Sequence, residues 1–442
     1  MDTTRKLAAY VADTQFQDLP AEVVREAKLC FLDWLAVTLA GAREADVDSL
    51  AQVIALVGGE PQASVIGRPV KTSILNAALL NGMSSHVLDF DDTSVEFLGH
   101  PSVTLFPGIL AAAEWRRESG RAFLAAYVLG YETGCRVALG ASPNHYLAGW
   151  HGTSTIGHFA AAAGTAKLLG LNADGLVHAL GTAGTQASGL KAVFGTSCKP
   201  FHAGKASFDG LLAALLAQRG FTSTGDILEG QKGFWEMFSK DWKPEDALQG
   251  LGVQWYILKN NYKFHASCYG THAPIEAALA LKRVEGIEGR QIRAMEIHVS
   301  RPMLDVAGKE RPETGLEAKF SIPYSVANAL LNRDTGMNAF TDERVHAPET
   351  VALQQRIRLV PDDTLAPFEA EIRLDLEGRS LRQKFNMLEH VMDPREKEDK
   401  IVGKFLALGG LAFAPDRLER IVARVLDLEA EEDMAAWMAM LS

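Results

Sequence analysis

Apolar residues recur every three to four positions along most of the first 260 residues, which is the period of one face of an α-helix. The pattern is strongest from residue 18 to residue 41, where Asp18 and Pro20 are typical of a helix start and Gly41 of a helix end. An amphipathic helix is also expected directly after residue 6. Further helices are predicted for residues 50–57, 74–86, 102–115, 122–139, 153–169, 173–180 and 207–218. Residues 63–66 suit either a short strand or an extended loop, so this part of the chain predicts a helical bundle with hardly any strand.

The pattern changes after Cys268. Residues 368–377 alternate strictly between apolar and charged side chains, as in a strand with one buried and one solvated face. Gly378-Arg379 suits a turn into a partner strand. The other extended segments are predicted at residues 292–299 and 381–385, and helices at 274–281, 322–331, 349–355 and from 401 to 442. The chain is therefore predicted to be mainly α-helical, with a helical domain of residues 1–267 and 396–442 and a smaller α+β domain of residues 268–395.

Composition and charge narrow the possible partners. Of the 442 residues, 47% are apolar and 22% charged, and the net charge is −11 with no long basic run. This argues against a nucleic-acid or anionic-membrane partner. No apolar run reaches the ~20 residues of a membrane span, and the N-terminus lacks the features of a signal peptide. The four cysteines are widely spaced without a C-x-x-C, so we expect no zinc ribbon, no disulfide framework and a cytoplasmic location.

A stretch of ionisable residues interrupts the helical pattern after residue 85. It holds two histidines, three aspartates and a threonine, namely His86, Asp89, Asp91, Asp92, Thr93 and His100. A buried charge is costly unless it is paired, so a core has no use for such a group, whereas an active site does. Asp91 and Asp92 are equally well explained as residues that shape the loop.

Four further segments carry side chains that could bind or react, at residues 149–154, 198–205, 263–272 and 320–324. His151 precedes a predicted helix, whose free N–H groups suit a carboxylate. Lys199 is expected in a loop before the helix at 207–218. Each also has a structural explanation: His151 as a hydrogen-bonded core histidine, Lys199 and Lys263 as surface lysines, and Cys268 as a small buried side chain.

The same residues also suit other classes of protein. His86, Asp89, Asp91 and His100 could ligate zinc or a harder ion. However, no helix carries two ligands at the usual spacing, and the nearby lysines would repel a cation, so we expect no metal. A phosphate-binding loop, a dinucleotide fingerprint and a Gly-x-Ser-x-Gly motif are also absent from the sequence. A metal-dependent hydrolase and a non-catalytic carboxylate-binding protein remain as alternatives.

In their order along the whole chain, these motifs resemble those of the MmgE/PrpD family, which includes 2-methylcitrate dehydratases, cis-aconitate decarboxylases and an iminodisuccinate epimerase. The most specific element is Asp-Phe-Asp-Asp-Thr at residues 89–93, followed by His-Pro-Ser at 100–102. The other matching segments lie at residues 20–23, 81–83, 151–153, 199–204 and 271–274. The resemblance implies a large helical domain with the α+β domain inserted as a lid, a homodimer and no organic cofactor.

The resemblance also implies small di- and tricarboxylate substrates and a set of site residues. We assign Asp89, His100, His151 and Lys199 to catalysis, and Thr93, Lys263, Cys268 and Tyr324 to substrate binding. Dehydration requires a base, an acid and stabilisation of enolate-like charge, and we expect Asp89 or His151 as base and His100 as acid. Lysines and protonated histidines would bind the carboxylates. We therefore favour a hydro-lyase for a 2-methylcitrate-like acid, with a cis-aconitate-type decarboxylase or a dicarboxylate epimerase as alternatives.

Cys268 bears on this choice. The resemblance implies histidine here in cis-aconitate decarboxylases and cysteine in dehydratase-like members, which weakens the decarboxylase interpretation. The following Tyr269-Gly270 departs from the family's arginine–aromatic pair. This departure puts the usual carboxylate contact in doubt and points to a substrate other than 2-methylcitrate itself.

Overall fold

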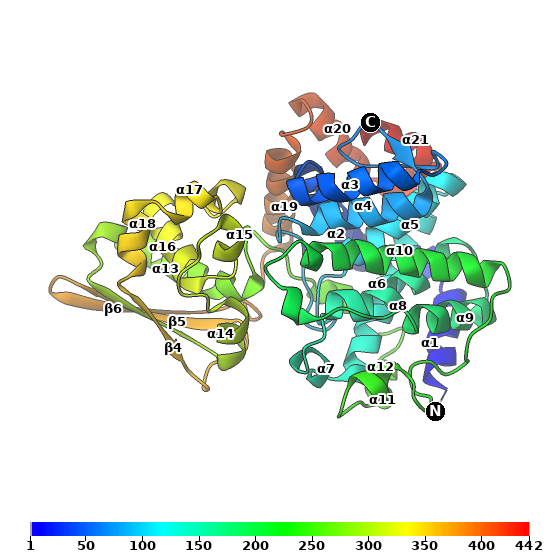
Figure 1. Cartoon of the computed structure of the whole chain (residues 1–442), viewed down its shortest axis with the longest axis horizontal. Helices are drawn as coiled ribbons and strands as arrows, with labels where there is room; N and C mark the ends of the chain where they lie inside the picture. Colours follow the sequence, from blue (N-terminus) through cyan, green and yellow to red (C-terminus); the bar gives the residue numbers. More distant parts are fainter. Residues whose placement is uncertain (1, 442) are drawn as a thin grey trace. The chain divides into compact units, whose positions relative to one another are not determined.

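The structure, a computed structural model, describes residues 2–441 and divides into two compact units (Figure 1). The helical unit comprises the residues up to Val87, Asp91–Tyr262 and the residues from Glu398 onward. The α+β unit comprises Lys263–Lys397 and the short segment Leu88–Phe90. This unit thus begins at Lys263, whereas the sequence pattern placed its start at residue 268. Among residues 2–441, no helix has both the length and the apolar character that a membrane crossing requires.

The fold is mainly α-helical, as predicted. The helices of the first 260 residues are α1 (Thr3–Asp13), α2 (Ala21–Gly41), α3 (Ala45–Val57), α4 (Ile74–His86), α5 (Ser102–Arg116), α6 (Gly120–Ala141), α7 (Asn144–Leu147), α8 (Gly152–Leu168), α9 (Ala173–Gly184), α10 (Cys198–Gln218), α11 (Phe234–Phe238) and α12 (Pro244–Leu248). The C-terminal helices are α19 (Pro394–Gly409), α20 (Pro415–Leu426) and α21 (Met434–Met438). The only strands among these described segments are β1 (Ala63–Ser64) and β2 (Lys71–Thr72), which pair with each other.

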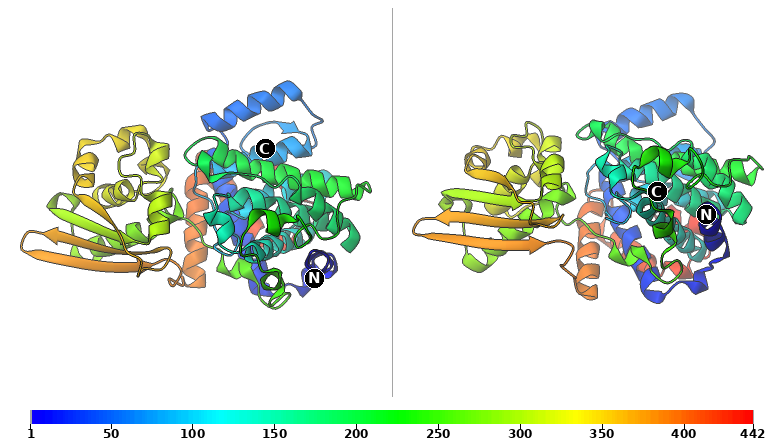
Figure 2. Two further views of the ribbon diagram at one scale, coloured as in Figure 1. Left: turned by 60° about the horizontal axis from the view of Figure 1, so that its bottom comes forward. Right: turned by 90° about the horizontal axis from the view of Figure 1, so that it is seen from below.

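Small residues let the central helices of the helical unit approach closely. A Cβ atom added to Gly82 on α4 would lie 2.5 Å from the Cα atom of Gly204 on α10, so neither position has room for a side chain. Helix α8 is buried along nearly its whole length and packs against α6 and α10 (Figures 1 and 2). This packing brings the C-terminal end of α4 and the N-terminal ends of α8 and α10 into one region of the unit.

Helix starts show where local sequence signals suffice and where they do not. Helices α4 and α9 begin at local caps, because the side chains of Ser73 and Asn172 accept the backbone N–H groups of Asn76 and Gly175. The prediction that Lys199 lies in a loop is wrong, since α10 already begins at Cys198. Pro200 lies in the first turn of α10, which tolerates proline because its N–H groups have no intrahelical partner.

The α+β unit contains one sheet with the strand order β4-β3-β5-β6. Its strands are β3 (Ala294–Val299), β4 (Ile357–Pro361), β5 (Glu369–Leu376) and β6 (Arg379–Asn386), and its helices are α13 (His272–Glu285), α14 (Arg301–Ala307), α15 (Gly315–Ala318), α16 (Ile322–Asn332), α17 (Asp342–Val345) and α18 (Pro348–Gln354). The alternating segment forms β5, and its apolar side chains Ala370, Ile372 and Leu374 are buried in one core with those of α13 and α16. Figures 1 and 2 show these helices on one face of the sheet. Strand β4, which pairs in parallel with β3, was not predicted.

Candidate functional site

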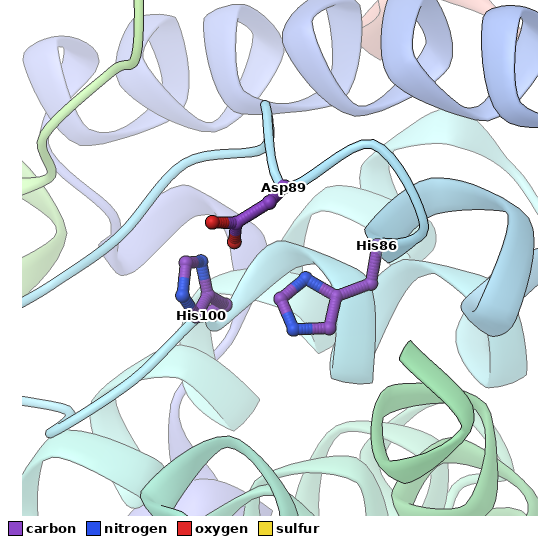
Figure 3. A group of neighbouring side chains, drawn as sticks. All are labelled: His86, Asp89 and His100. Atoms are coloured by element: carbon purple, nitrogen blue, oxygen red, sulfur yellow. The ribbon is translucent and has the colours of Figure 1, made fainter. Parts of the chain in front are cut away.

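The carboxylate of Asp91 lies between two imidazole rings in the helical unit. The Nδ1 atom of His86, the last residue of α4, lies 3.0 Å from both carboxylate oxygens. The Nδ1 atom of His100 lies 2.9 Å from Oδ2 of Asp91 and 2.8 Å from the backbone carbonyl oxygen of Asp92. The centroids of the two rings, which Figure 3 shows together with Asp89, are 4.7 Å apart. Because an ionised carboxylate only accepts hydrogen bonds, both rings carry their hydrogen on Nδ1. The Nε2 atoms of both rings are therefore left to take part in chemistry.

The charge states in this group follow from burial and from the hydrogen bonds. Burial opposes ionisation of Asp91, but the two histidines outweigh it and hold its pKa well below the usual value. Burial lowers the pKa of His86 to about 4, although the Asp91 carboxylate opposes this shift. Together these directions describe an ionised Asp91 beside a neutral His86. The Nε2 atom of His86 is buried and accepts no hydrogen bond from residues 2–441. Such an atom marks a place for a ligand or water.

His151 continues the row of histidines. Its ring stacks on that of His86, with the centroids 6.2 Å apart, and its Nδ1 atom lies 3.0 Å from Nδ1 of His202. Burial and the positive charge of Lys199 hold the pKa of His151 well below its usual value. His151 is the N-cap residue of α8, as the sequence predicted, and the edge of Phe194 packs against its ring. We call His86, Asp91, His100, His151 and His202 the histidine cluster.

Lys199 and Thr93 support this cluster in different ways. Lys199 is 6% exposed, lies in the first turn of α10, and lowers the pKa values of His86, His151 and His202. Thr93 donates from Oγ1 to the carbonyl of Gly99 at 3.1 Å. A Cβ atom on Gly99 would lie 2.5 Å from the backbone nitrogen of Thr153, so glycine is needed there. Thr93 thus closes the loop that carries His100.

Asp89 is held by two lysines of the α+β unit. Lys263 is fully buried and donates from Nζ to the carbonyl oxygen of Asp89 at 2.9 Å and to its Oδ1 atom at 3.1 Å. Lys319 donates to the carbonyl of Leu88. Asp89 has φ +51°, a left-handed conformation that residues other than glycine rarely adopt. Because strained backbone persists only where its surroundings hold it, the two lysines account for this conformation. We call Lys263, Lys319 and Asp89 the lysine cluster.

Of the remaining predicted residues, Cys268 contacts the lysine cluster, whereas Tyr324 packs against Phe340. The backbone N–H of Cys268 donates to the carbonyl of Lys319 at 2.9 Å. Tyr324 is fully buried on α16, and its hydroxyl donates to the carbonyl of Ala339. His272, at the start of α13, has its pKa held well below the usual value by burial and by the charges of His265 and Lys263. Its Nε2 atom is buried and has no hydrogen-bond partner within residues 2–441.

The structure therefore groups the predicted residues in two sets. His100, His151 and Lys199 lie in and beside the histidine cluster, and Asp89, Lys263 and Cys268 in and beside the lysine cluster. Sequence reasoning assigned no role to His202, Lys319 or the buried ring of His272. It placed His86 and Asp91 in the candidate active-site stretch and weighed both as metal ligands, but it gave neither a catalytic role. One signal for His202 was available, because it follows Lys199 by three positions and thus shares a helix face with it.

A metal remains chemically possible at one place. His86, Asp89 and His100 each offer one ligand atom, and these atoms lie within 4.8 Å of one another (Figure 3). Two imidazoles and a carboxylate form a donor set that suits zinc or iron. The positive charge of Lys199, which already lowers the pKa of His86, opposes a cation there.

Comparison with known proteins gives one consistent result. The model of the MmgE/PrpD N-terminal domain matches residues 5–247, and that of the MmgE/PrpD C-terminal domain matches residues 265–428. The cis-aconitate decarboxylase-like protein oryM of Aspergillus oryzae is 30% identical over 478 residues, covering 100% of this chain and 97% of the relative. The cis-aconitate decarboxylases of Aspergillus terreus and Mus musculus are 27% and 26% identical, covering 99% and 97% of this chain and 96% and 91% of their own lengths.

Proposed function

Since this chain belongs to the MmgE/PrpD family and is a lyase of that type, we propose that it acts on a small di- or tricarboxylate, with its own side chains as acid and base. The leading reaction is the elimination of water from a hydroxy acid. The observation that carries this proposal is the pair formed by His151 and His100. His151 is kept in the unprotonated form by burial and Lys199, whereas the ring of His100 donates to an ionised carboxylate.

The substrate class follows from the positive groups at the histidine cluster. The chain as a whole carries a net charge of −11, so a polyanionic substrate needs local cations. Lys199 supplies one, and the N-terminal end of α8 offers free N–H groups and the positive end of the helix dipole. Lys263 is proposed as a second lysine that binds a substrate carboxylate. Its two hydrogen bonds to Asp89 would compete with that binding. Thr93, Cys268 and Tyr324 are proposed to limit the shape of the substrate.

In the proposed elimination, Nε2 of His151 removes the proton from a carbon next to a carboxylate. The electron pair of that C–H bond moves into the carboxylate as an enolate-like charge, which Lys199 stabilises. The pair then returns to form the C=C bond while the neighbouring C–O bond breaks. His100 in its imidazolium form gives a proton to the leaving hydroxide, and water departs. Asp91 stabilises that imidazolium, as a carboxylate beside a catalytic histidine does. Asp89 is the alternative base.

Decarboxylation is the second candidate, because the relatives named above are cis-aconitate decarboxylases or resemble them. In that reaction a C–C bond to a carboxylate breaks and carbon dioxide leaves. The electron pair passes into the conjugated acid, and a histidine of the cluster returns a proton to carbon. This route needs an acid but no base. The presence of an unprotonated His151 therefore favours elimination of water.

One experiment separates these reactions. The purified protein is incubated in deuterated water with a panel of di- and tricarboxylic acids that includes 2-methylcitrate and cis-aconitate, and products are followed by NMR. Loss of water from a hydroxy acid supports the leading proposal, and release of carbon dioxide supports the second. Deuterium entering a substrate without either loss would indicate an epimerase. Absence of turnover across the panel, or full activity of His151→Asn, would contradict a lyase that uses this site. His346→Asn is the matched control, because His346 is exposed in the α+β unit.

We further propose that the protein is a homodimer located in the cytoplasm. The homodimer is proposed because the resemblance to the MmgE/PrpD family implies one. The cytoplasmic location is supported by the cysteines: no disulfide joins any two of them among residues 2–441, as expected in a reducing compartment. Light scattering during size-exclusion chromatography would give the mass of the assembly, to be compared with 47.9 kDa for one chain.

A further inference from the structure

No role follows from the sequence for His202, yet its ring is the direct hydrogen-bonding partner of His151. The two Nδ1 atoms lie 3.0 Å apart, and the ring centroids 5.3 Å apart. His202 lies on the first turns of α10, three positions after Lys199, whereas His151 precedes α8. His151 makes no other side-chain hydrogen bond within residues 2–441. The bond to His202 is therefore the side-chain hydrogen bond that determines which way the His151 ring is turned.

The ring of His158 carries a positive charge that acts on His202. The Nδ1 atom of His158 lies 2.6 Å from the carbonyl oxygen of Ser154, and its Nε2 atom 2.9 Å from Oδ2 of Asp209. A carbonyl and an ionised carboxylate both only accept, so His158 carries a hydrogen on each nitrogen and is an imidazolium. Asp209 is held in the ionised form by His158 and by Lys205, which outweigh its burial. His158 is fully buried, so both of its ring nitrogens depend on these protein acceptors.

That charge explains why His202 stays neutral. Burial, the charge of His158 and the charge of Lys199 together lower the pKa of His202 to about 4. The pKa of His151 is also held well below its usual value. Near pH 7 the pair therefore consists of two neutral imidazoles, with a single hydrogen between their Nδ1 atoms. One ring must donate while the other accepts, so the tautomer of each ring determines that of the other.

This arrangement matches the task of His151. To act as a base, His151 needs its lone pair on Nε2 and its hydrogen on Nδ1, which then donates to the lone pair of His202. After Nε2 has taken a proton, the Nδ1–H still donates to the same neutral acceptor, so no atom has to move. We propose that His202 is the positioning residue that holds His151 in the tautomer and orientation required for proton transfer at Nε2. The inference rests on the proposed function, because that function gives His151 its role as base.

Two variants of similar size test this role. In His202→Asn, the amide lies at the position of the Nδ1 atom and can accept or donate, so the partner of His151 is retained. In His202→Leu, the side chain has nearly the same shape but no hydrogen-bonding group. General base catalysis contributes on the order of 10²–10⁴-fold, so we expect His202→Leu to lower kcat by about 10- to 100-fold with KM nearly unchanged. His202→Asn should restore most of this loss. Equal losses in both variants would overturn the proposal, as would an effect on KM alone.

A second readout does not depend on activity, so it remains informative even if the proposed function fails. The protein is labelled with ¹⁵N-histidine, and His151 is assigned by comparison with His151→Asn. In the ligand-free wild type and in His202→Asn, His151 should give the signals of one tautomer with its hydrogen on Nδ1. In His202→Leu, these signals should move toward the mixture of tautomers found in free histidine. Unchanged signals in His202→Leu would overturn the proposal. The same midpoint of thermal unfolding in both variants would show that the fold is preserved, and His346→Asn serves as the control for loss of a histidine elsewhere.

Discussion

Replacing Asp91 with asparagine would remove one acceptor from the centre of the histidine cluster without changing the size of the side chain. The carboxylate accepts the Nδ1–H of His86 at 3.0 Å and that of His100 at 2.9 Å. An amide has one accepting oxygen, and its NH₂ group donates. Whichever way the amide turns, one imidazole N–H faces another donor. If that ring is His86, it must adopt its other tautomer or rotate away, whereas His100 keeps an acceptor in the backbone carbonyl of Asp92, 2.8 Å from its Nδ1 atom.

The size of the effect can be estimated from burial and from the number of hydrogen bonds. Asp91 and the side chain of His86 are fully buried. A hydrogen bond to a charged group contributes about 1.5–3 kcal/mol, and a buried donor left without an acceptor costs about 1–3 kcal/mol. Loss of the buried charge offsets part of this cost, because the carboxylate no longer has to be desolvated. We expect a net loss of about 1–3 kcal/mol in the free energy of unfolding.

The effect on catalysis should be larger than the effect on stability. The neutral amide no longer stabilises the imidazolium form of His100, which the proposed acid step requires. A positioned acid or base contributes about 10²–10⁴-fold, and the corresponding Asp→Asn change in the Ser-His-Asp triad lowers kcat by about 10⁴-fold. We therefore expect Asp91→Asn to lower kcat by about 10²-fold or more, with a smaller change in KM.

The neighbouring residue Asp92 provides a matched control. Burial and the charge of Asp33 raise the pKa of Asp92 to about 8, so at pH 7 its carboxyl is already neutral and hydrogen-bonded to Ser102 and Asn260. Asparagine resembles a protonated aspartate, so Asp92→Asn should change kcat by less than about fivefold. Urea unfolding and steady-state kinetics on both variants give the comparison. Equal losses in the two variants, or kcat of Asp91→Asn near that of the wild type, would refute the reasoning.

Three further predictions follow from the charges of the buried groups. Burial lowers the pKa of His86 from 6.5 to about 4, so between these values the unfolded chain binds a proton that the folded protein does not. As the pH decreases through this range, this group should lower the free energy of unfolding by about 1.4 kcal/mol per pH unit. Urea unfolding at several pH values should show a shallower decrease for His86→Asn than for the wild type. Equal dependence on pH in the two proteins would contradict the lowered pKa. Lys263→Met should lower the free energy of unfolding by about 3–5 kcal/mol, because it removes the cation bonded to a buried carboxylate. A double-mutant cycle with Asp89→Asn should give a coupling energy above about 1 kcal/mol. Removal of metal ions by a chelator should leave turnover unchanged; a loss that added zinc restores would instead place a metal on His86, Asp89 and His100.

Much of the fold could be predicted from local sequence signals. Helix α4 is an example, because Ser73 caps it and the apolar period ends at His86, where the structure also ends it. Strand β5 is another, since strict alternation specifies which side chains face the core. Both signals depend on residues that are neighbours in the sequence, and such interactions are the ones a single sequence reports directly.

The unpredicted features depend on contacts between distant residues. Strand β4 has only five residues, and its place beside β3 depends on a parallel pairing across more than fifty residues of chain. The role of Asp91 stayed open because nothing in the sequence indicates that His100 returns to its carboxylate. The charge of His158 likewise depends on Asp209, which is 51 positions away. Residue types indicated that this region carries chemistry, but the assignment of donors and acceptors required the three-dimensional structure.

The loop between His86 and His100 connects the two clusters by its covalent chain. Leu88–Phe90 belongs to the α+β unit by its contacts, while Val87 and Asp91 on either side of it belong to the helical unit. Asp89 and Asp91 are two residues apart, so their Cα atoms are at most about 7 Å apart. Lys263 and Lys319 therefore bind the backbone just before Asp91, whose carboxylate contacts the rings of His86 and His100. The left-handed conformation of Asp89 indicates that this hold carries a cost in backbone strain. Two buried lysines, one of which binds both the backbone and the carboxylate of Asp89, therefore stabilise this left-handed conformation.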